Sequence, residues 1–220
     1  MQLKIDKIKE IILAEAKIYQ DKRYSKLIEE FNLPYKDKLP KNIGYLISKA
    51  IVKQIEKEKN ISFSNFFIKS VRLNHKGTPL ESISFSQINY NEIINEDWSN
   101  SYIHKVFNSE FLFFIFKYLN KEDTEPVFIS TQFWKMNSED LDLANKFWEL
   151  TKDNIQRGDY DNFISIRNNF ICHVRTKGIN SQDVILTPQG TYQKKRSFWL
   201  NASYIKTQIK NEHFHSKSKS

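Results

Sequence analysis

The stretch "NNFICHVRTKGINSQDVILTPQGTYQKKRSFWLN" (168–201) holds two apolar runs, and cations lie at the end of one and before the other. The first run ends in Arg175 and Lys177, and the second follows Tyr192 and the cations of 194–196. Short apolar runs rich in β-branched and aromatic residues are typical of strands. A Pro-Gln-Gly sequence between them predicts a turn. We therefore expect two strand ends that bring an aromatic ring and several cations close together.

Patterns along the rest of the chain predict helices that flank a partly antiparallel sheet. Apolar residues at helical spacing predict helices over residues 4–22, 24–33, 42–59 and 137–158. For the last of these, Asn137 or Ser138 is the expected N-cap, and Gly158 lies just past the expected end. Strand-like runs occupy residues 62–73, 81–90, 111–119 and 126–134. Because only the turn sequence "NHKGTP" separates the first two runs, we expect them to pair as a hairpin.

The domain organisation follows from this order of elements. We predict one mixed α/β domain over residues 1–212, with a helical part at about 1–59 and a sheet-rich remainder. Residues 213–220 are expected to form a frayed tail.

The composition excludes several classes of protein. The 220 residues are 40% hydrophobic and 14% aromatic, which is enough for an ordinary core and argues against intrinsic disorder. The 34 lysines and arginines exceed the 26 acids, so the net charge is +8 and favours a polyanionic partner. Cys172 is the single cysteine, which excludes an internal disulfide and a cysteine-rich zinc site. We interpret it as an inert buried thiol, and His173 beside it as a core or edge residue rather than a ligand.

The sequence indicates neither a membrane span nor a secretion signal. No window approaches 18 uncharged apolar residues, and "FLFFIF" (111–116) has the length of a buried strand. The first ten residues contain no apolar core of a signal peptide. We therefore expect a cytoplasmic protein without a membrane partner.

Several ordered motifs together resemble MutH and the MutH-like type II restriction endonucleases that cut DNA at GATC. These are "GYLISKA", "FFIKSVRLNHKGTPLESISF", "NEDWSNS", "FLFFIF", "ICHVRTK" and "LTPQGTYQKKRSFWLN". They are most similar to the second, DNA-binding half of two-domain GATC-cutting enzymes, and the likeness covers about residues 1–210. The resemblance implies a restriction-endonuclease-like fold, a mixed sheet flanked by helices.

Members of this family use two or three carboxylates and a strand lysine to hold Mg²⁺ and orient the attacking water. The lysine of the Glu-x-Lys motif falls on Lys69, but its glutamate falls on Phe67. The upstream aspartate falls on Asn60, and the acid that closes the family's helical motif falls on Ser48. Lys41 is a possible substitute for the first lysine of that motif, and we expect it to contact DNA. The resemblance therefore implies that Lys69 is a remnant of a catalytic site.

A hard divalent cation needs anionic oxygens, which these replaced positions do not offer. We therefore expect no metal and no cofactor for this chain alone. An alternative stays open in which Glu56, Glu58 or Glu81 moves into the site and restores Mg²⁺ binding.

The residues that the family uses to recognise DNA have clearer counterparts in this sequence than its catalytic carboxylates have. Arg175 and Lys177 fall on the arginine and lysine that follow a strand in the family, and Tyr192 falls on its recognition tyrosine. Lys194 and Lys195 match a lysine pair beside that tyrosine. Arginine can donate two hydrogen bonds to guanine, and lysines neutralise phosphates, so the chemistry suits these roles.

Three functions follow as hypotheses. The first is sequence-specific binding of double-stranded DNA at GATC by an allosteric half without its own active site, which implies a catalytic nuclease domain or subunit as partner. The second is an active Mg²⁺-dependent type II restriction endonuclease with relocated acids. The third is a scaffold that reuses the fold without DNA.

Overall fold

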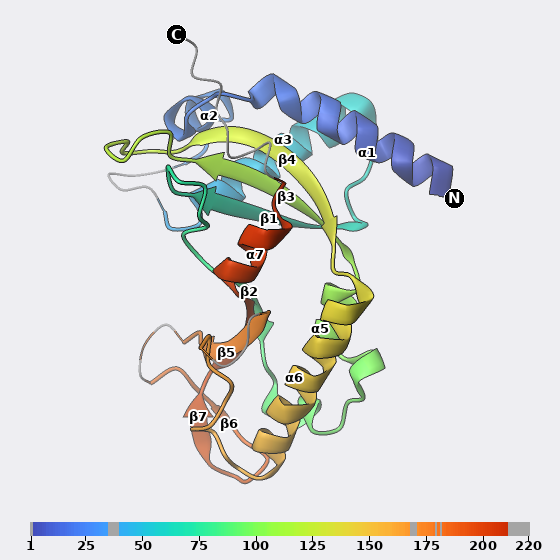
Figure 1. Ribbon diagram of the computed structural model, residues 1–220, viewed down its shortest axis with the longest axis vertical. Helices are drawn as coiled ribbons and strands as arrows, with labels where there is room; N and C mark the ends of the chain where they lie inside the picture. Colours follow the sequence, from blue (N-terminus) through green and yellow to red (C-terminus); the bar gives the residue numbers. More distant parts are fainter. Residues whose placement is uncertain (1, 35–39, 168–170, 179, 181, 211–220) are drawn as a thin grey trace. The chain divides into compact units, whose positions relative to one another are not determined.

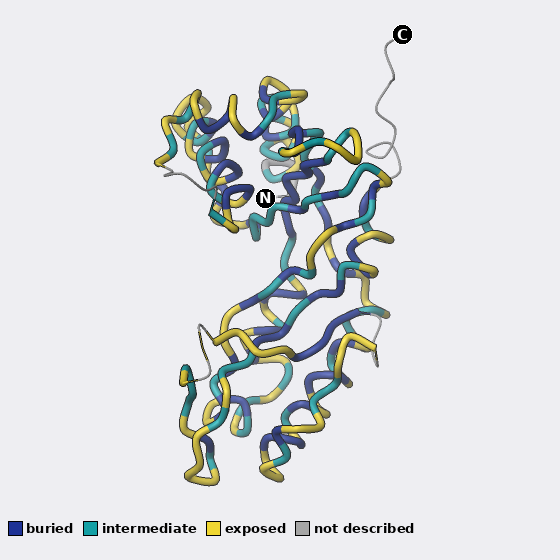
Figure 2. Tube along the Cα trace, turned by 90° about the vertical axis from the view of Figure 1, so that its left-hand side faces the viewer, coloured by how far each residue is buried: buried dark blue, intermediate teal, exposed yellow. Residues whose placement is uncertain are grey.

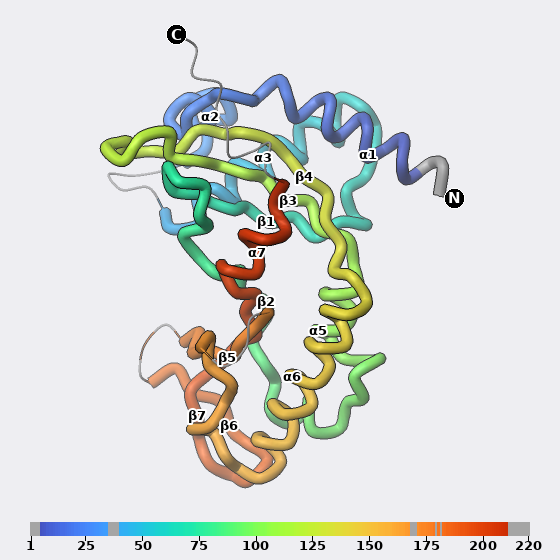
Figure 3. Tube along the Cα trace, in the orientation of Figure 1, coloured from blue at the N-terminus to red at the C-terminus, as the bar shows by residue number. Residues whose placement is uncertain are grey.

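The computed structural model describes residues 2–34, 40–167, 171–178, 180 and 182–210. The chain forms two compact units. The first unit consists of residues 1–81, 110–134 and 206–220, and the second of residues 82–109 and 135–205. The chain therefore leaves the first unit and returns to it twice, as its colouring along the sequence shows (Figure 3).

The first unit combines helices with one sheet (Figure 1). Its helical elements are α1 (Gln2–Ala16), η1 (Lys17–Tyr19), α2 (Tyr24–Glu30) and α3 (Ile43–Lys59). Its strands are β1 (Phe66–Leu73), β3 (Glu110–Lys117) and β4 (Val127–Lys135), and they lie in the order β1-β3-β4.

The pairing of β1 corrects the predicted hairpin. β1 runs parallel to β3, with Phe66 opposite Glu110 and Leu73 opposite Lys117. The turn after β1 does form, because Asn74 accepts hydrogen bonds from the backbone amides of residues 76 and 78. The chain after that turn, however, pairs in the other unit, so the prediction of a hairpin between 62–73 and 81–90 was wrong.

The core of the first unit lies between its helices and one face of the sheet. Ile12, Leu27 and Ile51 from α1, α2 and α3 are buried against strand residues such as Leu112 and Phe114. Buried and exposed residues alternate along the helices, as the colours in Figure 2 show. Because an amphipathic helix buries one stripe, these helices are stabilised mainly by the apolar area they cover.

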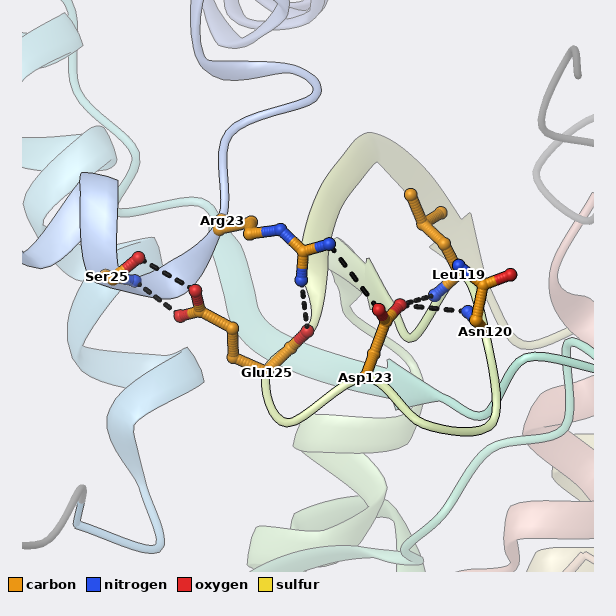
Figure 4. A network of polar contacts seen from close by, with 6 residues as sticks. All are labelled: Arg23, Ser25, Leu119, Asn120, Asp123 and Glu125. Carbon is orange, nitrogen blue, oxygen red and sulfur yellow. Dashed lines mark hydrogen bonds and ion pairs between the residues drawn. The ribbon is translucent and has the colours of Figure 1, made fainter. Parts of the chain in front are cut away.

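A polar network ties the start of α2 to the loop before β4 (Figure 4). The backbone amide and hydroxyl of Ser25 each donate to Glu125, at 2.8 Å. Arg23 donates to the Glu125 carbonyl and forms an ion pair with Asp123. Asp123 also accepts from the backbone amides of Leu119 and Asn120, at 2.8 and 2.9 Å. This carboxylate therefore shapes the loop and holds Arg23.

The network predicts a pH dependence of stability. Hydrogen bonds from the Asn120 and Leu119 amides, together with Arg23, lower the pKa of Asp123 below its ordinary value. A carboxyl whose pKa is lowered in the folded state stabilises the fold above its unfolded pKa of about 4, and this contribution is lost as the pH falls through the folded pKa. Urea titrations should therefore find Asp123→Asn less stable than the parent at pH 6, with the gap closing below about pH 4.

The matched control is Glu122→Gln, which changes an exposed acid in the same loop. The difference in free energy of unfolding between pH 6 and pH 3 should be the same for Glu122→Gln as for the parent. A gap for Asp123→Asn that stays constant with pH would contradict the assigned role of the carboxylate.

The second unit contains a second sheet, a separate two-stranded ribbon and several helices. The sheet has the order β2-β8-β5, formed by β2 (Ile83–Gln87), β8 (Arg196–Leu200) and β5 (Cys172–Thr176). The ribbon pairs β6 (Val184–Leu186) with β7 (Tyr192–Lys194). The helical elements are α4 (Tyr90–Ile93), η2 (Trp98–Asn100), α5 (Tyr102–Phe107) and α6 (Ser138–Gln156). α7 (Ala202–Gln208) begins in this unit and ends in the first.

Helix α6 has the ends that the sequence predicts. The Asn137 side chain accepts a hydrogen bond from the Asp140 amide and caps the N-terminus. Gly158 follows the last turn with a φ of 73°, a conformation that favours glycine. Phe147 of this helix packs edge-on against Phe198 of β8, so α6 covers one face of the second sheet.

The structure confirms the α/β class of the protein. The single domain over residues 1–212 stays a prediction. The predicted tail at 213–220 lies outside the described residues. In the described part of the chain, no helix has the length and apolar character needed to span a membrane.

Candidate functional site

The ribbon β6–β7 presents its predicted aromatic residue on an exposed face. Leu186 lies opposite Tyr192, and Val184 lies opposite Lys194. Because side chains alternate along a strand, these four residues share one face, while Ile185 and its partner share the other. Tyr192 is 69% exposed and Leu186 46% exposed. The shared face is called the ribbon face below.

Hydrogen bonds hold the ribbon at both strands and at its turn. The Tyr90 hydroxyl donates to the Lys194 carbonyl at 2.7 Å, and the Asn91 side chain donates to the Leu186 carbonyl at 3.1 Å. Gln189 in the turn donates to the carbonyls of Ile155 and Gln156 and accepts from the Tyr160 hydroxyl. The ribbon is therefore fixed to α4 and α6 before any ligand arrives.

Arg175 lies at the end of β5 with its guanidinium already positioned. Its Cζ lies 4.4 Å from the centre of the Trp199 ring. The same ring is stacked with His173, its cross-strand partner in the ladder between β5 and β8. The sequence motifs did not point to Trp199 as the platform for Arg175. The signal was available once the strands were paired, because Trp199 is the diagonal neighbour of Arg175 in this register.

The other predicted cations of this region are engaged to different degrees. Lys177 Nζ donates to the Phe85 carbonyl, and desolvation lowers its pKa below the ordinary value. Lys195 forms an ion pair with Asp183, and its own carbonyl accepts from the Lys177 amide at 2.9 Å. Lys194 has an exposed side chain on the ribbon face. The DNA-binding roles of these three lysines stay predictions, and the geometry favours Lys194 among them.

The neighbouring Cys172 and His173 are buried, as expected. Burial raises the pKa of the Cys172 thiol. Burial also lowers the pKa of His173, whose Nδ1 is hydrogen-bonded to Asn201. Both residues therefore serve the packing of β5.

Lys69 lies on the sheet of the first unit among aromatic neighbours. It is opposite Phe113 in the β1–β3 ladder, and it shares its face with Phe67 by alternation. The Phe67 ring lies 5.7 Å from Phe111, which in turn contacts Phe113 and Trp134. At Phe67, the position that the resemblance assigns to a family carboxylate, the structure therefore has a ring that belongs to an aromatic cluster.

Ser48 and Asn60 both take part in the structure of helix α3. Ser48 is fully buried and donates to the Gly44 carbonyl at 2.8 Å. α3 packs in the core on the face of Phe66, opposite to the face of Lys69. Asn60 ends α3 with a φ of 50°, a left-handed conformation that asparagine tolerates. Lys41 is exposed two residues before α3 begins.

The three acids considered for relocation have other partners. Glu56 accepts from the Phe63 amide at 2.9 Å, Glu58 accepts from Gln54 at 2.5 Å, and Glu81 forms an ion pair with Arg72. Among the described residues, no group of three or more acids, histidines or cysteines could hold a metal ion. Phe67 and Phe113, which neighbour Lys69 on the sheet, offer no oxygen to Mg²⁺, which prefers anionic oxygen ligands. That the chain binds no metal of its own stays a prediction.

Comparison with known proteins supports a relation to restriction endonucleases. No protein-family model matches the chain. The chain is 25% identical, over an alignment of 262 residues, to the type II restriction enzyme Sau3AI of Staphylococcus aureus. This alignment covers 94% of the chain but only 52% of that enzyme, so the chain spans about half the length of this relative.

Proposed function

We propose that this protein is a DNA-binding relative of the type II restriction enzymes, that it recognises duplex DNA at GATC, and that it does not cut DNA by itself. Its fold would be restriction-endonuclease-like, in keeping with the α/β class and the similarity to Sau3AI. The observation that carries the proposal is the fixed ribbon β6–β7, whose exposed face bears Tyr192 and Lys194.

A two-stranded ribbon has the dimensions to enter the major groove of B-DNA. The hydrogen bonds from Tyr90, Asn91 and Gln189 hold the ribbon in place, so little conformational entropy remains to be lost when it binds. Arg175 adds a guanidinium held on Trp199, and arginine can donate two hydrogen bonds to guanine O6 and N7. The net charge of +8 favours the approach of the polyanion.

The proposed lack of cleavage rests on the surroundings of Lys69. Phe67 and Ser48 are packed in apolar and helical surroundings, and Glu56, Glu58 and Glu81 are engaged elsewhere. Since the chain spans about half of Sau3AI, we propose a catalytic nuclease domain or subunit as its partner, with this chain as the allosteric half.

Competition binding separates the three hypotheses of function. A labelled GATC duplex should be displaced by unlabelled GATC duplex at much lower concentration than by a scrambled duplex. Equal competition would reject sequence-specific recognition, and no binding at low salt would favour a scaffold. Cleavage of a GATC plasmid by the purified chain with Mg²⁺, lost in Lys69→Ala, would instead establish the endonuclease.

Lys194→Ala should weaken binding to all duplexes to a similar extent. Its exposed ammonium is proposed to contact a phosphate, so its loss should lower affinity without changing the preference for GATC. The slope of log K against log salt should become about 1 unit less steep.

Lys152→Ala provides the control, because this lysine of the same unit donates to the Glu96 carbonyl and lies over Trp148. Its salt slope should equal that of the parent. A loss of GATC preference in Lys194→Ala would contradict the assignment to phosphate.

A further inference from the structure

The ribbon face carries an apolar pair that phosphate binding does not explain. Leu186 and Tyr192 lie directly opposite each other, and both are largely exposed. Exposing apolar surface forgoes the stabilisation that burial would give, roughly 25 cal/mol per Å². An isolated exposed leucine needs no explanation, but this one adjoins an exposed aromatic ring on a ribbon that is fixed to the unit.

The position of Leu186 is set by the backbone on which it lies. Its carbonyl accepts the hydrogen bond from Asn91, and its β6 backbone pairs with β7. The turn that follows is closed by the hydrogen bond from the Gly190 amide to the Thr187 carbonyl and by the contact between the Thr187 and Thr191 hydroxyls. Gly190 has a φ of 78°, which this turn requires and which glycine adopts without strain. The leucine side chain therefore has a defined direction, on the same face as Lys194.

The chemistry of the DNA major groove limits which base the Leu186 side chain can contact favourably. The major-groove edges of the base pairs present hydrogen-bond donors, acceptors and one apolar group, the 5-methyl group of thymine. A ribbon that enters this groove with an apolar pair on its outer face finds a matching surface only at thymine. The GATC site has one thymine on each strand.

We propose that Leu186, with Tyr192 beside it, reads the thymine of the site by contact with its 5-methyl group. The inference rests on the proposed function and adds a base to the guanine assigned to Arg175. Leu186 thus determines specificity through apolar contact, whereas Lys194 on the same face contacts the backbone.

The test compares thymine with deoxyuridine, which lacks only the methyl group. Fluorescence anisotropy titrations would use a GATC duplex, the same duplex with deoxyuridine in place of both thymines, and a scrambled duplex. The parent protein should bind the deoxyuridine duplex about fourfold more weakly for each methyl contact, as expected for burying one methyl-sized group. Leu186→Ala should bind the two duplexes equally, and Leu186→Met should retain most of the difference.

Leu150→Ala is the matched control, because Leu150 is an equally exposed leucine on α6 of the same unit. It should discriminate between the two duplexes as the parent does. Equal binding of thymine and deoxyuridine duplexes by the parent, with preference for GATC over the scrambled duplex intact, would overturn the role of Leu186 and leave the proposed function standing. The same discrimination in Leu186→Ala as in the parent would overturn it as well. If the parent binds the GATC duplex and the scrambled duplex equally, the proposed function and this inference are both rejected.

Discussion

Arg175→Ala should weaken binding to a GATC duplex by about 1–3 kcal/mol, or roughly 5- to 150-fold. The guanidinium is held on the Trp199 ring, so its donors are oriented before DNA arrives. The loss should fall mainly on the specific complex, because a scrambled duplex lacks a guanine at the place in the site that this side chain is proposed to read. Titrations of both duplexes at the same salt concentration measure the difference directly.

Arg175→Lys distinguishes the hydrogen-bonding pattern from the charge. Lysine keeps the positive charge but cannot form the planar, two-pronged contact of arginine, and it stacks less well on an aromatic ring. We expect this variant to bind the scrambled duplex like the parent and to lose most of its preference for GATC. Full preference in Arg175→Lys would show that the contact is electrostatic only.

The fold of the Arg175 variants can be checked independently. Arg175 is exposed, so its replacement should cost no more than the cation–π contact with Trp199, about 1 kcal/mol in the free energy of unfolding. Trp199→Phe offers a further step, since it keeps a ring beneath Arg175 but reduces the cation–π attraction. An intermediate loss of preference is expected for it.

Local patterns were sufficient to predict the elements that depend on local interactions. The continuous apolar run at 111–116 is the buried strand β3, and Asn137 and Gly158 mark the ends of α6 as expected. A cap depends on residues within one turn, so a single sequence contains the necessary signal.

Pairing between distant strands could not be predicted in the same way. The alternation of apolar and polar residues in 81–90 is compatible with any antiparallel neighbour. In the structure this segment pairs with β8, which lies more than one hundred residues away in the sequence. The sequence pattern likewise predicted only a turn between two strands where the structure has the ribbon β6–β7. Each strand of this ribbon is three residues long, which is too short for a clear alternation pattern.

The candidate site shows a similar limit. The family resemblance predicts Arg175, Tyr192 and Lys194 as DNA-binding residues, but the sequence does not show which cations already have partners. Lys195 is paired with Asp183, twelve residues earlier, and Lys177 with a carbonyl of β2. Such pairings depend on the register of the sheet, which becomes known only from the fold.

Ser48→Glu, which places an acid at a position that the resemblance assigns to a family carboxylate, should destabilise the protein by several kcal/mol. Ser48 is fully buried on α3 and donates to the Gly44 carbonyl, so a glutamate would lose this bond and bring a larger, ionisable group into the core. Burial raises the pKa of a carboxyl group, so the variant should be less destabilised near pH 4 than at pH 8. Urea denaturation at the two pH values measures this difference, and Ser48→Ala is the control without a charge.

The same physical reason predicts that acids added at the positions that the resemblance assigns to the family's carboxylates will not form a metal site. Phe67→Glu would place a carboxylate against Phe111 in an aromatic cluster, and Ser48 lies on a helix that packs on the opposite face of the sheet from Lys69. A variant that combines Ser48→Glu, Asn60→Asp and Phe67→Glu should therefore neither cut a GATC plasmid nor gain thermal stability from Mg²⁺. Asn60→Asp alone should fold normally, since aspartate also tolerates the left-handed conformation at the end of α3. Stabilisation of the triple variant by Mg²⁺ would mean that the acids can still converge on Lys69, and it would favour an enzyme over a binding module.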